Sequence, residues 1–255
     1  MKPSLTFEDL FHDPTYLAFK NHLYNYQLRI RAIRANVDVT RGLILEVGSG
    51  VSPILPPLPG IVHTDISAEA VRVNTANRSI RTGFAVDAAF IPLASASVET
   101  LVCSEVLEHI PDDTAALQEF ARVIRPGGRM VITVPVHQYF FSADDRAVGH
   151  HRRYEVKELL PRLKTLGFGD FHTEIVTGLA DKAGMLAATT MFGGGRGSHS
   201  PNDSRSGARL AWLLPLYKTM NTIYGGVAWL EARIIPEALA TIVLIRAQRQ
   251  SRNQH

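Results

Sequence analysis

The sequence predicts an α/β protein built on a mainly parallel sheet with helices on both faces. Short apolar runs with the character of buried strands alternate along the chain with segments whose apolar residues recur at helical spacing. Strands that alternate with helices are typical of a parallel sheet covered on both sides. The length of 255 residues suits one domain of this class with additions.

Seven segments have the character of strands. Each is a short run of apolar, mostly β-branched residues bounded by glycine, proline or polar residues. In chain order they are residues 43–47, 61–65, 82–87, 99–105, 129–136, 169–178 and 240–247.

Three segments have the apolar spacing of amphipathic helices. The first stripe lies within residues 7–34, and the second follows Asp112 and Asp113, either of which can cap it. The third stripe runs from Val156 and ends at Gly167. These helices supply the apolar faces that such a sheet needs.

We expect a single domain made of a central core with additions. Residues 1–39 form an N-terminal helical cap, 40–179 the ligand-binding core, 180–239 a helical insertion that acts as a lid, and 240–255 the last strand and tail. Within the insertion, residues 193–207 are rich in glycine and serine, a composition typical of a mobile loop.

Composition argues against several functions. The formal charge of +3 is small and the basic residues are scattered, so we expect no nucleic-acid partner. Cys103 is the single cysteine, which excludes an internal disulfide and favours a reducing compartment. The first residues lack the apolar region of a signal peptide, so we expect a cytoplasmic protein. The histidines have no metal-binding spacing, and no metal site is predicted.

Polar residues follow the first four predicted strands, where a parallel sheet binds its ligands. They are Glu46 with the glycine turn 48–50, then Asp65, then Asp87, then Ser104 with Glu105. The carboxyl ends of these strands meet at one edge of the sheet. We therefore expect these residues to share one site.

The glycine turn does not suit a dinucleotide. A pyrophosphate is normally held by G-x-G-x-x-G and the N-terminus of the helix that follows. Here the turn reads "GSGVSP", the third glycine is missing, and four prolines between residues 53 and 59 prevent a regular helix. A ligand without phosphates fits this turn better.

The carboxylates at the strand ends suit a nucleoside that carries positive charge. Asp65 can accept from both hydroxyls of a ribose, and Asp87 can accept from the exocyclic amine of adenine, while the backbone N–H of Ala88 can donate to the ring. Carboxylates with no basic residue among them favour a cation and repel phosphates. Together these demands describe S-adenosylmethionine.

The chain resembles the class I S-adenosylmethionine-dependent methyltransferases over about residues 40–175. Four segments carry the resemblance in the order that this class has: "ILEVGSG", "HTDIS", "VDAAFIPLASASVETLVCSEVLEHIPD" and "EFARVIRPGGRMVITVP". The longest is similar to the small-molecule, methyltransferase type 11-like branch. One departure is the proline-rich stretch, which stands where the class has its first crossover helix.

This resemblance implies a Rossmann-like, seven-stranded sheet in which the last strand, 240–247, is antiparallel. It also implies S-adenosylmethionine as the cofactor. The residues expected to bind it are Glu46, Gly48, Ser49, Gly50, Asp65, Ile66, Asp87, Ala88, Ser104 and Glu105.

Two stretches offer a base or a contact for the methyl acceptor. His109 follows the fourth strand, where it either acts as a base or simply lines the site. His150 belongs to a "GHxRRY" segment, residues 149–154, that is similar to one found among sugar- and lipid-modifying methyltransferases. Arg152, Arg153 and Tyr154 of this segment would face the acceptor, with Asp144 or Asp145 paired to an arginine.

Alternatives remain for these residues and for the cap. Arg152 and Arg153 could instead anchor the next helix through ion pairs. In the cap, Tyr16 and Phe19 would serve partly as core and partly as a lid that contacts the acceptor.

The sequence thus favours a methyltransferase that acts by in-line displacement on a small-molecule or lipid- or sugar-linked acceptor. The alternatives are a non-catalytic protein that binds S-adenosylmethionine or S-adenosylhomocysteine and, with less support, an NAD-dependent oxidoreductase. The apolar piece 208–236 either packs over the acceptor site or makes a weak peripheral membrane contact.

Overall fold

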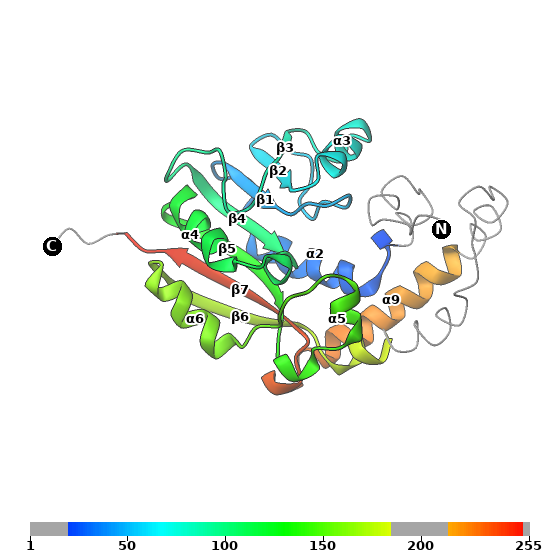
Figure 1. Cartoon of the computed structure of the whole chain (residues 1–255). Coiled ribbons are helices and arrows are strands. Elements are labelled where there is room, and N and C mark those ends of the chain that lie inside the picture. The colour runs from blue at the N-terminus through cyan, green and yellow to red at the C-terminus, as the bar shows by residue number, and fades with distance from the viewer. Residues whose placement is uncertain (1–19, 185–213, 252–255) are drawn as a thin grey trace, which may run out of the picture.

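The computed structural model describes residues 20–184 and 214–251 (Figure 1). Tyr16, Phe19 and the glycine- and serine-rich piece 193–207 lie outside these described residues.

A seven-stranded sheet with the order β3-β2-β1-β4-β5-β7-β6 forms the centre of the molecule. Strand β7 is antiparallel to both of its neighbours, β5 and β6, while the pairs among β1 to β5 are parallel. The predicted fold class is therefore confirmed. The strands are β1 (Ile44–Val47), β2 (Ile61–Asp65), β3 (Gly83–Ala85), β4 (Val98–Ser104), β5 (Ile124–Pro135), β6 (Phe168–Thr177) and β7 (Ile242–Arg249).

Helices cover both faces of the sheet because its strands are apolar on both sides. On one face, α4 (Asp113–Val123) and α6 (Val156–Thr165) pack on a core that includes Phe120 and Leu163. On the other face, α2 (Tyr24–Asn36) packs with α9 (Leu214–Glu231) around Ile33. Two separate apolar cores result, as expected for a doubly covered parallel sheet.

The shorter elements lie beside the carboxyl ends of the strands. They are α3 (Ala68–Ala76), η2 (Leu107–His109), η3 (Gln138–Phe140), α5 (Ala143–Ala147) and η5 (Glu237–Leu239). Residues 48–60 between β1 and β2 contain no helix, in agreement with the prolines there.

Some predicted boundaries need correction. Helix α2 begins at Tyr24, and residues 22–23 are not helical, so the predicted stripe is interrupted there. The part of the stripe before residue 20 lies outside the described residues. Strand β5 begins at Ile124 rather than 129, because Ile124 pairs with Val98 before the ladder resumes at Arg129. Asp112 is the residue that caps α4, accepting hydrogen bonds from two backbone N–H groups.

The described part of the insertion is helical. It contains α9 and the short η5, and α9 lies along α2 (Figure 1). Within residues 20–184 and 214–251, no helix is both long enough and apolar enough to cross a bilayer.

Candidate active site

A cavity of about 770 Å³ opens at the carboxyl ends of β1, β2 and β4. All ten residues predicted to bind the cofactor line it, and so do three of the residues predicted at the acceptor end, His109, His150 and Arg153. The fold thus places the strand-end residues together, as parallel strands require.

Glu46 organises the first wall of the cavity. It is 3% exposed, and its two carboxylate oxygens accept from the backbone N–H groups of Ile54 at 2.7 Å and Leu55 at 3.0 Å. Burial raises the pKa of Glu46 to about 7, although these two hydrogen bonds favour the ionised form. The carboxylate therefore accepts from two backbone N–H groups of this loop, which in a helix would donate to backbone carbonyls.

Other side chains also hold the proline-rich loop. The Tyr26 hydroxyl donates to the Ser52 carbonyl at 2.8 Å, and Arg34 Nε donates to the Ile54 carbonyl at 2.8 Å. His63 Nε2 lies 3.2 Å from the Leu55 carbonyl oxygen. Burial lowers the pKa of His63 and so favours its neutral form, in which an N–H at Nε2 can donate to this carbonyl.

Asp65 binds the glycine turn to the start of α3. One carboxylate oxygen accepts from the Gly50 N–H at 2.7 Å and the other from the Ser67 N–H at 2.9 Å. Each oxygen keeps a further lone pair that can face the cavity. Asp65 is thus fixed in position and can still accept from a ligand.

The two glycines of the turn have different requirements. Gly48 has a φ of +74°, and a Cβ at this position would lie 2.1 Å from Cγ2 of Val106. Gly50 has a φ of +51°, and a Cβ there would have no atom within 4 Å. The turn therefore touches the segment after β4 at Gly48 and leaves space for a ligand at Gly50.

The part of the cavity that follows β3 combines a polar and an apolar group. Asp87 accepts from the Ala89 N–H at 2.9 Å and lines the cavity beside Ala88. Ile66 also lines it with a side chain that is 78% exposed. An exposed isoleucine next to a carboxylate suits a flat, hydrogen-bonding ring such as a purine.

The opposite wall contains two histidines whose rings meet edge to face, with centroids 4.6 Å apart. His150 Nδ1 lies 2.9 Å from Asp145, which also binds Arg153 at 2.8 Å. Burial and the neighbouring His150 lower the pKa of His109 to about 4, and burial lowers the pKa of His150. Burial therefore favours the neutral form of both rings.

Two of the residues predicted to contact the acceptor do not face the cavity. Tyr154 is buried, and its hydroxyl donates to Asp113 at 2.7 Å. Arg152 pairs with the same Asp113 at 3.3 Å, so this arginine joins its segment to α4. The prediction that these residues contact the acceptor is thus wrong for this geometry, because a buried carboxylate on α4 attracts both.

Several cavity residues were not identified by sequence reasoning. Lys20 and Arg29 line the cavity from the N-terminal segment, and Asp181 and Lys182 line it after β6. Burial lowers the pKa of Lys20 to about 8, with a further lowering by Arg29. These residues belong to no sequence motif. The only signal in the sequence that could have indicated them is their position in or beside a predicted helix.

Comparison with known proteins agrees with this geometry. Residues 45–132 match the family model described as "Methyltransferase domain". The seven-stranded sheet with its antiparallel β7 and the acidic residues at the strand ends are those that the resemblance to the class I S-adenosylmethionine-dependent methyltransferases implies, and this chain is similar to that class. Its cofactor is S-adenosylmethionine.

Curated relatives are similar over part of their length. A "probable S-adenosylmethionine-dependent methyltransferase" of Mycolicibacterium smegmatis is 29% identical over 69% of this chain and 67% of its own length. A ubiquinone biosynthesis O-methyltransferase of Xanthomonas oryzae is 27% identical over 42% of this chain. The match spans only 48%, about half, of the length of that relative.

Among solved structures, a methyltransferase of Thermotoga maritima has the same fold. It superposes with a TM-score of 0.60 and 14% identity, and the match covers 92% of each chain. This similarity shows a shared fold across nearly the whole chain.

Proposed function

We propose that this protein transfers the methyl group of S-adenosylmethionine to a small-molecule or lipid- or sugar-linked acceptor. One observation carries the proposal: a single cavity joins the glycine turn and Asp65 on one wall to His109 and His150 on the other. A cofactor and an acceptor could therefore meet inside it. The core 40–179 would bind the cofactor, while the cap 1–39 and the insertion 180–239 would shape the acceptor end.

Residues that line the cavity suit the parts of the cofactor in order. Asp65 would accept from the ribose hydroxyls, and Asp87 with the Ala88 N–H would bind the adenine against Ile66. Arg29, whose Nε has no hydrogen-bond partner, would face the methionine carboxylate. Glu46 would contribute less directly, because its oxygens already accept from the proline-rich loop.

The reaction would be an in-line displacement at the methyl carbon. The bond from the acceptor atom to the methyl carbon forms while the carbon–sulfur bond breaks, and the electron pair returns to sulfur. The protein needs chiefly to align the two molecules and exclude water. His109 and His150 lie where a proton from the acceptor could be taken up.

The curated relatives favour an oxygen acceptor. The X. oryzae relative is named as an O-methyltransferase of ubiquinone biosynthesis, whose acceptor is a small molecule. By analogy we propose a hydroxyl group as the methyl acceptor of this chain.

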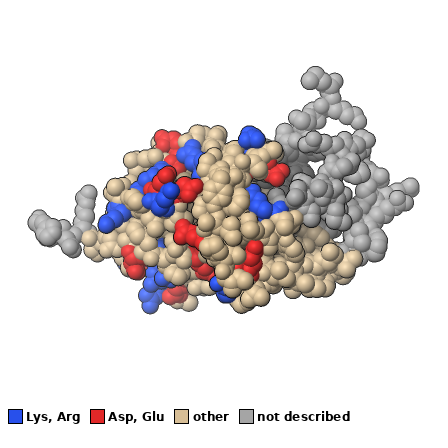
Figure 2. All heavy atoms as spheres, turned by 90° about the horizontal axis from the view of Figure 1, so that it is seen from below, with Lys and Arg blue, Asp and Glu red and all other residues tan. Residues whose placement is uncertain are grey.

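A membrane contact is a further part of the proposal. Leu216, Met220, Ile223, Val227 and Leu230 are each more than half exposed and share one face of α9. On the face shown in Figure 2, charges of both signs are mixed, while the end that carries α9 is largely uncharged. Flotation with anionic liposomes tests this contact. Protein that remains wholly in the aqueous fraction at low salt would exclude it.

Calorimetry with S-adenosylmethionine and S-adenosylhomocysteine tests the cofactor site. Asp65→Ala should weaken binding by about 100-fold, because two hydrogen bonds to a charged group are lost. Glu69→Ala is the control, since Glu69 pairs with Arg72 on the outside of α3. Absence of binding by the folded wild-type protein would overturn the proposal.

Labelled cofactor incubated with cell extract tests turnover. Transfer of label to an extract component supports an enzyme, and loss of that transfer in Asp65→Ala ties it to this cavity. Binding of both ligands with no transfer to any acceptor would instead favour the non-catalytic alternative.

A further inference from the structure

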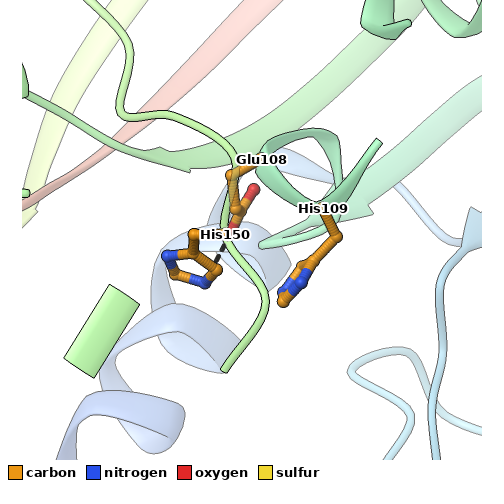
Figure 3. A group of neighbouring side chains, drawn as sticks. All are labelled: Glu108, His109 and His150. Carbon is orange, nitrogen blue, oxygen red and sulfur yellow. Dashed lines mark ion pairs between the residues drawn. The ribbon is translucent and has the colours of Figure 1, made fainter. Parts of the chain in front are cut away.

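Three potential metal ligands gather at the acceptor end of the cavity. Glu108, His109 and His150 each offer an oxygen or nitrogen atom, and these atoms all lie within 4.8 Å of one another. Figure 3 shows that Glu108 and His109 come from η2 and that His150 comes from the loop after α5. No sequence spacing predicted this group, because His150 is far from the other two in the chain.

Glu108 is the unusual member of the group. Its side chain is 0% exposed, and neither carboxylate oxygen has a hydrogen-bond partner. Buried carboxylates in native proteins are normally paired or hydrogen-bonded. The nitrogen of the group that faces it is His150 Nε2, which lies 3.8 Å from a Glu108 oxygen, longer than a hydrogen bond. Glu108 thus has two unused acceptors that face the histidines.

His150 is held in an orientation that suits a ligand. Its Nδ1 lies against Asp145 at 2.9 Å, and Asp145 is itself fixed by Arg153 at 2.8 Å. This leaves Nε2 directed toward Glu108 (Figure 3). Metal-binding histidines commonly have such a carboxylate on the nitrogen that does not bind the metal. Asp145 would therefore be a positioning residue.

The surroundings also allow a bound cation to contact a further molecule. His109 and His150 line the cavity, whereas Glu108 lies behind them. A cation bound by the three residues would be shielded from solvent on the Glu108 side and accessible from the cavity.

We propose that Glu108, His109 and His150 bind one divalent transition-metal cation, with Zn²⁺ as the best match. Two imidazoles and one carboxylate form a ligand set that zinc accepts while keeping a fourth position open. Slight closure of the three side chains would bring the ligand atoms to bonding distance. The cation would compensate the buried Glu108 carboxylate.

The role of this cation rests on the proposed methyl transfer. The acceptor hydroxyl would occupy the open position and bind the metal, which lowers the pKa of that hydroxyl. Its proton leaves to water, the oxygen attacks the methyl carbon, and the carbon–sulfur electron pair returns to sulfur. On this account the two histidines act as ligands rather than as bases.

Metal binding can be measured without any methyl acceptor. The full chain is freed of metal with EDTA, passed to chelator-free buffer, and titrated with Zn²⁺ by calorimetry and with Co²⁺ by visible absorption. We expect one cation per chain and a Co²⁺ absorption typical of four-coordinate geometry. His109→Ala and His150→Ala should each weaken binding at least tenfold, and Asp145→Asn should weaken it by about 10- to 100-fold.

His151→Ala is the matched control, because His151 is exposed and adjacent in sequence but outside the cavity lining. It should bind the cation like the wild type. Circular dichroism of each metal-free variant confirms folding, and Glu108→Gln provides a second, near-isosteric test of the site. Absence of a bound cation, or equal binding by the ligand variants and His151→Ala, would overturn the proposal.

Cofactor binding is measured separately in EDTA. Failure to bind S-adenosylmethionine would overturn the proposed function while leaving the metal titration interpretable. Failure to bind Zn²⁺ with the cofactor bound normally would overturn the metal site alone.

Discussion

Two buried glutamates on the walls of one cavity have opposite surroundings. Glu46 lies within β1, and both of its oxygens accept hydrogen bonds from backbone N–H groups of the proline-rich loop. Glu108, in η2, is equally buried and has no hydrogen-bond partner on either oxygen. Burial raises the pKa of both groups.

The difference separates a structural carboxylate from one that is available to a ligand. Glu46 replaces the missing crossover helix by satisfying two N–H groups that would otherwise be buried without acceptors. The Glu108 carboxylate makes no hydrogen bond, so burial of this side chain only costs free energy unless another group binds it. Substitutions at the two positions should therefore have different effects on the free energy of unfolding.

Glu46→Ala should give the largest effect. It leaves two buried N–H groups without acceptors, at about 1–3 kcal/mol each. We expect the free energy of unfolding near pH 7 to fall by about 2–5 kcal/mol in denaturant titrations. Glu69→Ala, on the surface of α3, should change it little. A loss below about 1 kcal/mol on substitution of Glu46 would contradict the structural role of this carboxylate.

The pH dependence of stability should also depend on Glu46. The pKa of Glu46 is about 7 in the folded chain against an ordinary value of 4.5, so below pH 4.5 the carboxyl is protonated in both states. As pH rises toward 7, the unfolded state ionises first and stability falls, by about 3 kcal/mol in total.

Glu46→Gln removes this contribution and isolates it. We expect the stability of the wild type relative to Glu46→Gln to decrease between pH 4.5 and 7, and to stay level above that range. The charged or titratable groups facing Glu46 are Tyr26, Arg34, His63 and Asp65, which both proteins share. If the stabilities of the two proteins changed with pH in parallel, the raised pKa of Glu46 would be contradicted.

Gly48→Ala should be destabilising by about 2 kcal/mol more than Gly50→Ala. Both substitutions force a residue with a Cβ into a left-handed conformation, at about 1 kcal/mol. Only the first also places a methyl group 2.1 Å from Val106, which overpacks the contact between the β1 turn and the segment after β4. Thermal unfolding of the two variants gives the difference. Equal losses of stability in the two variants would show that the contact between Gly48 and Val106 has room for a methyl group.

Glu108→Leu should have the smallest effect on stability. In EDTA we expect the free energy of unfolding to stay within about 1 kcal/mol of the wild type or to rise, because no hydrogen bond is lost and a buried polar group is removed. Denaturant titrations beside Glu46→Ala make the comparison direct. A loss as large as that of Glu46→Ala would mean that Glu108 is structural as well.

The cavity wall that faces the cofactor could be predicted from the sequence to a large extent. Asp65 ends β2 and Asp87 comes just after β3, so their meeting at one edge follows from a parallel sheet. The acceptor wall could not be predicted in this way. Its residues come from loops whose positions depend on tertiary contacts, as the burial of Tyr154 against Asp113 illustrates.

The sequence by itself determined the order of strands and helices, the absence of a helix after β1, and the class of cofactor. These depend on local patterns: apolar runs, a glycine turn and prolines that remove backbone donors. Only the tertiary structure decided that Glu46 would satisfy the proline-rich loop and that Glu108 would meet His150. Those contacts join distant segments, and their energy comes from burial and hydrogen bonding that no local pattern encodes.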